Sequence, residues 1–214
     1  MTLEGGLYGQ PAMNLLEQFG EIDIYLFDQL LKGRLSPGMS ILDAGCGGGR
    51  NLIYFLRNGY EVYGVDRNRE AVAQVRRIAS RLRPSLPLEN FAVSTVEEMP
   101  FPGESFDAII SSAVLHFAKD EPHFNAMLEE MWRVLKPGGL FFARLASSIG
   151  IEKLIEQVEG RRFLLPDGTE RFLVDEEMLN SATNKLGAEW LDPLKTTNVQ
   201  NLRCMTTWVV RRLQ

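Results

Sequence analysis

Cysteine and histidine are scarce in this sequence of 214 residues, which contains only Cys46, Cys204, His116 and His123 of these two types. Two cysteines cannot build a disulfide framework, and a low cysteine content is typical of a reducing compartment, so we expect a cytoplasmic protein. Two histidines give no convincing metal cluster, and we expect no metal centre. Long apolar runs are also absent. Because no stretch approaches the roughly 18 residues of a membrane helix, we expect no membrane span.

Positive charge is in deficit, with 23 lysines and arginines against 28 acidic residues and a formal net charge of −5. This balance disfavours nucleic acid as a partner, because its phosphates would be repelled at long range. Hydrophobic residues make up 45% of the chain and charged residues 24%, which is enough for one substantial core. We therefore expect a single domain over residues 1–214.

Strand and helix patterns alternate through the middle of the chain. Strands are predicted at 40–43, 60–66, 88–93, 106–112 and 140–146, and helices at 50–58, 68–82 and 122–135, with Asn68 as an N-cap. Such alternation is typical of an α/β fold, a doubly wound parallel sheet with helices on both faces. The later part of the chain predicts a hairpin at 161–165 and 170–174, a helix at 175–186 and strands at 188–194 and 203–211.

A glycine-rich loop follows the first predicted strand and opens the first predicted helix. Gly45, Gly47 and Gly49 lack a Cβ, so the backbone can turn tightly and a ligand can approach the main chain. The spacing is G-x-G-x-G, whereas the dinucleotide fingerprint G-x-G-x-x-G needs a glycine where this chain has Arg50. The next strand ends in Asp66, whose two carboxylate oxygens suit the adjacent hydroxyls of a ribose. The loop therefore indicates a nucleotide site that fits NAD poorly.

Four ordered segments carry a resemblance to a known family: ILDAGCGGGRN at 41–51, VYGVDRN at 62–68, residues 96–117, and RVLKPGGLFFARL at 133–145. Together they resemble the class I S-adenosylmethionine-dependent methyltransferases over residues 37–147. The GRN end of the loop is similar to the tellurite-resistance group, and the LHF and LKPGG segments are similar to the group of quinone-biosynthesis enzymes. The resemblance implies a Rossmann-like sheet of seven strands, mostly parallel with an antiparallel last strand.

The resemblance also implies how the domain is divided. Residues 1–36 would form N-terminal helices, in which Tyr8 to Phe27 would be a lid over the cofactor; a helix packed on the edge of the sheet is the alternative. Residues 37–147 would form the cofactor-binding core. Residues 148–214 would supply the hairpin, a helix and the last two strands on the substrate side.

S-adenosylmethionine is the implied cofactor, with S-adenosylhomocysteine as its product. By motif position the glycine loop would lie beside the methionine part, with Asp43 and the Ser111 carbonyl favouring its ammonium group. Asp66 would bind the ribose, and Val96 would flank the adenine, while Thr95 stands where the family often has an aspartate that accepts a hydrogen bond from adenine. The implied cofactor-binding residues are Asp43, Gly45, Cys46, Gly47, Gly49, Asp66, Arg67, Thr95, Val96, Ser111 and His116.

His116 is the first candidate for a general base, and the alternative is a loop histidine that shapes the pocket. His123 is expected at the surface, and Cys46 is expected as a small side chain in a crowded loop and not as a nucleophile. Arg144 stands in an apolar run, where it would grip an anionic substrate group or else reach solvent or pair with a structural carboxylate. The candidate substrate residues are Tyr8, Arg144, Lys195, Asn198 and Arg203, with Asn201 in the same turn as Asn198.

These patterns predict a methyltransferase that transfers a methyl group from S-adenosylmethionine to a small-molecule acceptor by in-line displacement. An NAD(P)-dependent oxidoreductase is disfavoured by Arg50 and by the lack of a Tyr-x-x-x-Lys pair. A non-catalytic S-adenosylmethionine-binding module is the second alternative, because this reaction needs no obligatory catalytic residue. The acceptor and the oligomeric state stay open.

Overall fold

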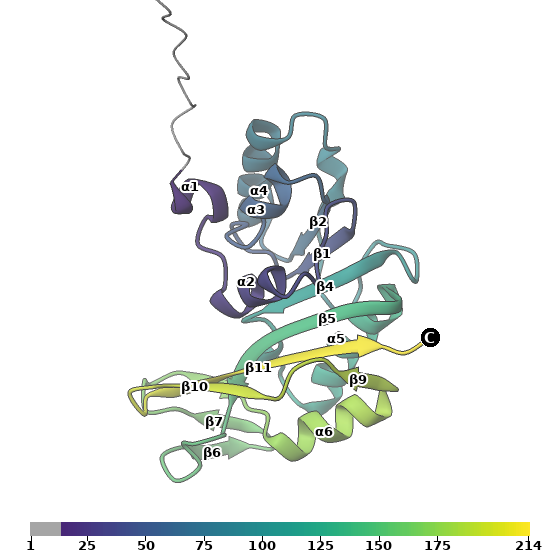
Figure 1. Ribbon diagram of the computed structural model, residues 1–214. Coiled ribbons are helices and arrows are strands. Elements are labelled where there is room, and N and C mark those ends of the chain that lie inside the picture. The colour runs from purple at the N-terminus through teal and green to yellow at the C-terminus, as the bar shows by residue number, and fades with distance from the viewer. Residues whose placement is uncertain (1–13) are drawn as a thin grey trace, which may run out of the picture.

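The computed structural model describes residues 14–214, so Tyr8 lies outside the described residues (Figure 1). The helices are α1 (Leu15–Phe19), α2 (Ile24–Leu31), α3 (Ile53–Arg57), α4 (Arg69–Leu82), α5 (Glu121–Val134) and α6 (Glu176–Lys185), with short 3-10 helices η1 (Leu88–Asn90) and η2 (Leu115–Phe117). The strands of the main sheet are β1 (Ser40–Ala44), β2 (Glu61–Asp66), β3 (Phe91–Val93), β4 (Phe106–Ser112), β5 (Leu135–Ser147), β9 (Ala188–Trp190), β10 (Lys195–Val199) and β11 (Arg203–Arg212). Within this range no helix has the length and apolar character needed to cross a membrane.

The main sheet has eight strands, in the order β10-β11-β5-β4-β1-β2-β3 with β9 also paired to β11. β1 lies parallel between β2 and β4, and β4 pairs in parallel with β5. β11 runs antiparallel to β5. Because β9 and β10 follow one another along the same edge of β11, the eight strands occupy seven positions. The predicted doubly wound sheet, mostly parallel with an antiparallel last strand, is confirmed.

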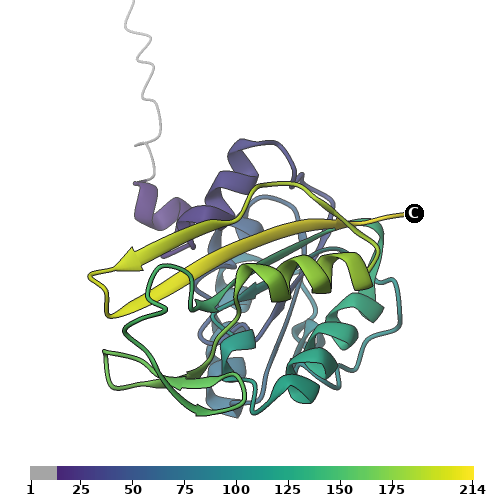
Figure 2. The same cartoon turned by 90° about the horizontal axis from the view of Figure 1, so that it is seen from below.

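Alternate residues of the strands face two hydrophobic layers. Ile41 and Phe142 pack with the apolar residues of α2, α3 and α4. Their neighbours Leu42 and Phe141 point to the other face, where α5 and α6 lie. Figure 2 shows α5 and α6 on the side opposite the N-terminal helices. Helices therefore cover both faces, which leaves the carboxyl ends of the parallel strands as the place for a site.

Local sequence signals explain where most elements begin, and three predicted elements are partly wrong. The strand predicted at 88–93 begins only at Phe91, because 88–90 form η1. Asn68 caps α4, as expected, by accepting from the N–H of Glu70. The helix predicted at 50–58 is wrong at its start, because 50–52 form turns and α3 begins at Ile53. The strand predicted at 188–194 is wrong beyond β9, because the chain bends before Pro193, which has no N–H to donate, and pairs again only as β10.

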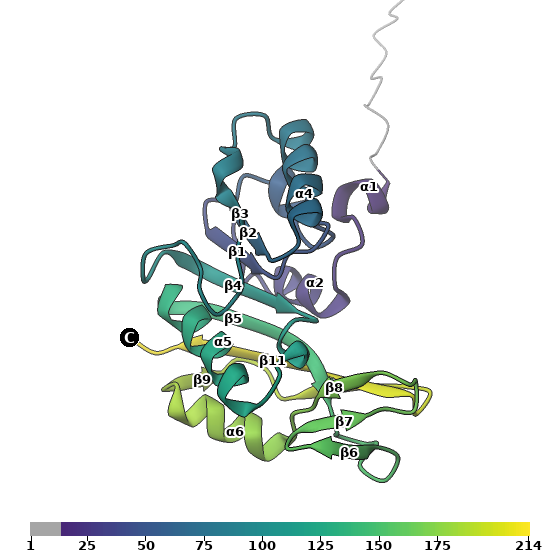
Figure 3. The ribbon, with the colours of Figure 1, turned by 180° about the vertical axis from the view of Figure 1, so that it is seen from behind.

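A second, small sheet follows β5. The predicted hairpin forms β7 (Arg162–Leu164) and β8 (Glu170–Phe172), and β6 (Glu156–Glu159), which the sequence analysis did not predict, adds a third strand. Figure 3 shows this sheet beside the ends of β10 and β11. An isolated bridge between Ser147 and Val174 connects it to the end of β5. The hairpin is thereby held next to the carboxyl end of the main sheet.

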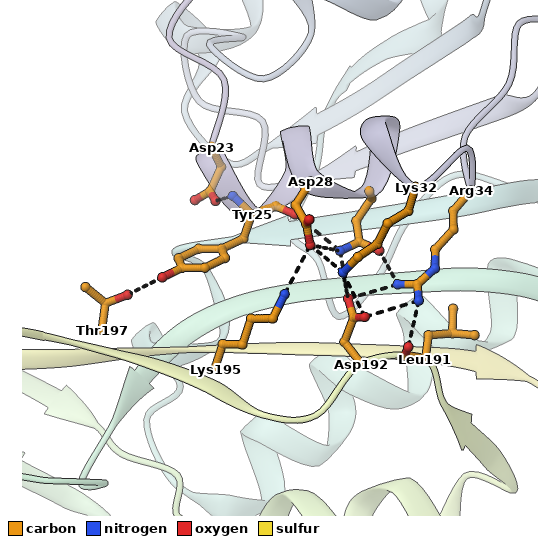
Figure 4. A network of polar contacts seen from close by, with 10 residues as sticks. Asp23, Tyr25, Asp28, Lys32, Arg34, Leu191, Asp192, Lys195 and Thr197 are labelled. Carbon is orange, nitrogen blue, oxygen red and sulfur yellow. Dashed lines mark hydrogen bonds and ion pairs between the residues drawn. The ribbon is translucent and has the colours of Figure 1, made fainter.

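Polar contacts fasten α2 to the segment between β9 and β10 (Figure 4). The Asp192 carboxylate, in a side chain only 9% exposed, accepts hydrogen bonds from Gln29 Nε2, Lys32 Nζ and both Nη atoms of Arg34. Such a bidentate arginine contact is geometrically demanding and fixes the relative position of the two segments. The N-terminal helix is thus joined to the last part of the main sheet.

Candidate active site

The glycine loop joins β1 to the turns before α3. Gly45 has φ +85°, and a Cβ there would lie 2.5 Å from Val114 Cγ2, so the loop excludes a side chain. The N–H groups of Gly45 and Cys46 donate to the Val65 carbonyl at 2.8 and 2.9 Å, which ties the loop to β2. At Gly47 φ is +50°, and a Cβ would meet no atom within 4 Å. The backbone is therefore fixed at Gly45 and borders open space at Gly47.

Asp66 ends β2 next to this loop. Its Oδ2 atom accepts from the N–H of Gly47 at 2.9 Å, and its Oδ1 atom accepts from the N–H of Asn68 at 2.8 Å. Each carboxylate oxygen can accept a second hydrogen bond, so the side chain stays available to hydroxyl donors while its position is fixed. Asp66 also lines a cavity of about 440 Å³. This geometry suits the ribose role that the sequence resemblance implied.

Asp43 is buried near the end of β1, with 1% of the residue exposed. Neither of its carboxylate oxygens has a hydrogen-bond partner among residues 14–214, and burial raises its pKa to about 7. A buried carboxylate without partners is costly and is normally matched by a donor or a cation. Asp43 therefore fits a cationic group next to the glycine loop. Ser111 Oγ, on β4, is another buried atom without a partner in the same range.

The cavity beside Asp66 collects five of the residues predicted to bind the cofactor. Its walls include Gly45, Asp66, Arg67, Thr95 and Val96. Val96 is 7% exposed and gives the cavity an apolar wall. Of the other predicted cofactor residues, Asp43 is on β1 and Ser111 on β4, the glycine loop holds Cys46, Gly47 and Gly49, and His116 borders a neighbouring cavity. The main cleft thus has a polar end at Asp66 and an apolar end at Val96.

Sequence reasoning missed part of this cleft. Phe117, Lys119 and His123 line it from η2 and the start of α5. His123 was expected at the surface, and its side chain is 20% exposed, with Nε2 3.3 Å from Glu97 Oε1 and Nδ1 accepting from the N–H of Lys119. Phe117 belongs to the LHF segment, so the resemblance held a signal for it. Nothing local in the sequence marked Lys119.

A second cavity of about 310 Å³ adjoins the first, with Ala113 in the walls of both. His116 borders it, and His116 Nδ1 accepts from the N–H of Ala146 at 3.2 Å. Burial, together with the charges of Arg171 and Arg203, lowers the pKa of His116 to about 4. The imidazole is therefore neutral near pH 7, with its proton on Nε2. This arrangement favours hydrogen-bond donation by His116 over the role of a base.

Arg144 projects from β5 towards the start of α2. Its Nη1 atom donates to Asp23 Oδ2 at 2.9 Å, and the Asp23 side chain is fully buried. Ser112 Oγ also donates to this carboxylate, and the N–H of Asp23 donates to Asn51. Pairing with a structural carboxylate, one of the alternatives for Arg144, is thus observed. The guanidinium nevertheless borders the second cavity, so it also faces a potential ligand.

The predicted substrate rim is only partly assembled. Arg203 lines the second cavity. Lys195 instead pairs with Asp28 at 3.1 Å, and the Asn198 side chain donates to Asn201 across the β10–β11 turn. Neither Lys195 nor Asn198 borders that cavity. The α2 contacts match a helix packed on the sheet, which was the alternative to a lid.

Two further observations concern the chemistry of the site. Cys46 is 5% exposed, and burial raises the pKa of its thiol, so the thiolate is disfavoured and the expected role as a small loop residue fits. Across the described part of the chain, no group of three or more His, Cys, Asp or Glu side chains is placed to hold a metal ion. The arrangement is suited to binding and orientation.

Comparison with known proteins identifies the central segment. Residues 42–143 match the family model described as a methyltransferase domain. The mitochondrial ubiquinone biosynthesis O-methyltransferase of Mus musculus is 31% identical over 175 residues, covering 72% of this chain and 44% of that protein. An uncharacterized methyltransferase of Synechocystis sp. is 31% identical over 107 residues, covering 50% of this chain and 47% of that protein. The chain spans about half the length of these curated relatives.

Solved structures share the fold of this chain. The crystal structure of Burkholderia thailandensis 1,6-didemethyltoxoflavin-N1-methyltransferase, with bound 1,6-didemethyltoxoflavin and S-adenosylhomocysteine, has a TM-score of 0.67. It is 19% identical and covers 88% of this chain and 76% of that chain, which is a likeness of fold. Fold and site define a Rossmann-like nucleotide-binding domain. The central segment, residues 42–143, accordingly matches the methyltransferase-domain family.

The residues present fit S-adenosylmethionine, the cofactor that the sequence resemblance implies. The unpartnered carboxylate of Asp43 matches a cationic ammonium group. Asp66 has acceptor capacity for a ribose, and the wall at Val96 is apolar enough for a purine. The fit rests on these orphaned and cavity-lining groups, and it agrees with Arg50 standing where a dinucleotide site needs glycine.

Proposed function

We propose that this protein transfers a methyl group from S-adenosylmethionine to a small-molecule acceptor. The observation that carries the proposal is the contact between two cavities. One is lined by Asp66 and Val96, the other by His116 and Arg144, and Ala113 forms part of both walls. A donor and an acceptor held in such adjacent spaces meet in a fixed orientation. Orientation alone supplies a large part of the rate in a reaction of two bound molecules.

The cofactor supplies its own electrophile, a methyl group on positively charged sulfur that leaves as a neutral thioether. The protein therefore needs to bind, align and exclude water. Asp43 would hold the ammonium group of the cofactor and Asp66 its ribose hydroxyls, and Val96 would pack on its base. His116 keeps a proton on Nε2 and would donate it in a hydrogen bond to the acceptor. The small size of the second cavity would favour a small acceptor.

Calorimetry with S-adenosylhomocysteine and with NADH separates this function from an oxidoreductase. We expect S-adenosylhomocysteine to bind and NADH to bind at least tenfold more weakly. Tighter binding of NADH would overturn the proposal. A location in the cytoplasm, a single domain over 1–214 and the lack of a nucleic-acid partner stay predictions from composition.

Turnover separates an enzyme from a non-catalytic binding module. The protein is incubated with methyl-labelled S-adenosylmethionine and the small-molecule fraction of a cell extract, and labelled products are separated by chromatography. We expect label in a small molecule that appears only with the protein. Tight cofactor binding without any labelled product would favour the binding module, and label confined to protein or RNA would contradict a small-molecule acceptor.

A further inference from the structure

The second cavity is cationic, although the chain as a whole carries a net charge of −5. Three arginines from three separate strands reach its wall: Arg144 from β5, Arg171 from β8 and Arg203 from β11. Among residues 14–214, Asp167 is the single carboxylate in that wall. Resting on the proposed function, we propose that this cavity binds an anionic oxygen group of the methyl acceptor, a carboxylate or a phosphate.

Arg171 is the arginine of this cavity with the most N–H donors available to a ligand. Among residues 14–214 no carboxylate lies within 4.0 Å of its guanidinium, and one Nη1 hydrogen bond goes to the Glu170 carbonyl at 2.7 Å. The guanidinium is steadied by the Phe117 ring, 5.0 Å away. Most of its five N–H donors therefore stay available in a fixed plane. By contrast, Arg161 near the same hairpin is used up in an ion pair with Asp175 at 2.8 Å.

Arg203 and Arg144 add charge on the other sides of the cavity. Arg203 lies 3.7 Å from Asp167, a distance too long for a direct hydrogen bond, so its donors are only partly neutralised. Asp167 is itself occupied by the N–H and hydroxyl of Thr169. Arg144 uses Nη1 for Asp23, and its buried Nε atom has no partner among the described residues. The cavity therefore has more donors than acceptors.

His116 shows that this charge is felt inside the cavity. The charges of Arg171 and Arg203 contribute, after burial, to the low pKa of its imidazole. A neutral histidine with a proton on Nε2 adds one more donor and no charge that would need a counter-ion. An anion fits such a site because it supplies the acceptors that the wall lacks, and charge-assisted bonds to arginine are about twice as strong as neutral ones. The planar guanidinium suits both carboxylate and phosphate.

The test measures anion binding to the complex with S-adenosylhomocysteine, whose formation is measured first by calorimetry. Benzoate, its neutral counterpart benzamide, and inorganic phosphate are then titrated separately into that complex in a phosphate-free buffer. We expect benzoate or phosphate to bind at least about tenfold more tightly than benzamide. Whether benzoate or phosphate binds more tightly shows whether the cavity suits a carboxylate or a phosphate of the acceptor. Failure of the first step would contradict the cofactor assignment, whereas failure of the second alone contradicts only the anion site.

Variants of Arg171 and Arg203 test whether the anion binds in this cavity. Arg171→Gln should lower the affinity for the anion about tenfold. Arg203→Gln should lower it only about threefold, since Arg203 is the more exposed of the two. Both variants should keep an S-adenosylhomocysteine affinity within about twofold of wild type. Arg211→Gln, on the same strand as Arg203 but away from the cavity, is the matched control and should bind like wild type. The proposal is overturned if neither anion binds, if benzamide binds as well as benzoate, or if both cavity variants keep wild-type anion affinity.

Discussion

Arg34 and Asp192 form a bidentate pair, with Arg34 Nη1 at 2.9 Å from Asp192 Oδ2 and Nη2 at 3.1 Å from Asp192 Oδ1. They lie 158 positions apart in the sequence. The pair joins the residues just after α2 to the bend between β9 and β10, as Figure 4 shows. The helix that carries Asp23, the partner of Arg144, is therefore anchored at its far end by contacts outside the active site.

Replacing Asp192 should loosen this anchor. Asp192→Ala removes the charged acceptor that Arg34 and Lys32 share in a partly buried setting. Arg34 keeps Gln29 Oε1 and Lys32 keeps Asp28, and the free energy of unfolding should fall by about 3 kcal/mol. Urea denaturation at pH 7 measures the change. Glu189→Gln is the control, because it removes an exposed pair with Arg211 at 3.9 Å and should change stability by less than about 1 kcal/mol.

The same carboxylate gives a pH dependence. Burial alone would raise the pKa of Asp192, but its hydrogen bonds with Arg34, Lys32 and Gln29 hold it well below its usual range. Because the folded-state pKa lies below the unfolded one, the stabilisation is complete above the usual carboxyl range and is lost as the pH falls below it. The stability difference between wild type and Asp192→Ala should therefore shrink between about pH 5 and pH 3. A difference that stays constant over this range would contradict the ion-pair role.

The contribution of Asp43 to stability should change with pH in the opposite direction to that of Asp192. Its folded-state pKa of about 7 lies above the usual carboxyl pKa of 3.8, so the folded protein holds a proton that the unfolded chain releases, and stability falls as the pH rises between these values. Asp43→Asn should remove this loss and stabilise the ligand-free protein at pH 8, by up to about 4 kcal/mol. Differential scanning fluorimetry of both proteins from pH 5 to pH 8 measures it.

Cofactor affinity should depend on pH in the opposite direction to the stability of the ligand-free protein. A bound ammonium group favours the ionised Asp43, so wild-type affinity for S-adenosylhomocysteine should rise as the pH increases through about 7, and should fall again only at the higher pH at which the ligand's own amino group loses its proton. In Asp43→Asn this rise should be absent. Calorimetry at several pH values makes the comparison, and parallel pH profiles in the two proteins would rule out the contact with the ammonium group.

The sequence predicted the parts of this site that depend on local chemistry. Asp43, Gly45 and Asp66 follow buried strands whose alternation predicts a parallel sheet, and the ends of such strands meet at one edge. The partner of Arg144 could not be predicted in this way, because Asp23 lies 121 positions away and the pairing depends on how α2 packs. Arg171 was missed because its orientation is set by the contact of β8 with Phe117 in η2.

Asp66 allows the ribose assignment to be tested. Asp66→Ala removes charged hydrogen bonds worth about 1.5–3 kcal/mol, so affinity for S-adenosylhomocysteine should fall by about tenfold to 150-fold. It also removes the acceptor for the Gly47 N–H, which would loosen the loop. Asp66→Asn keeps an oxygen acceptor of the same size, so its loss should be smaller. Calorimetry of the three proteins measures the series, and unchanged affinity in Asp66→Ala would contradict the assignment.

Two glycines of the loop separate folding from binding. Gly45→Ala places a Cβ against Val114 at a positive φ, so it should destabilise the fold by about 3 kcal/mol. Gly47→Ala meets no atom within 4 Å and carries only the backbone strain of a left-handed residue, about 1–2 kcal/mol. Its methyl group would enter the open space beside the loop, where the sequence resemblance places the cofactor. Gly47→Ala should therefore lose S-adenosylhomocysteine affinity by at least tenfold while losing less stability than Gly45→Ala, and normal affinity in this variant would show that the cofactor does not approach the loop there.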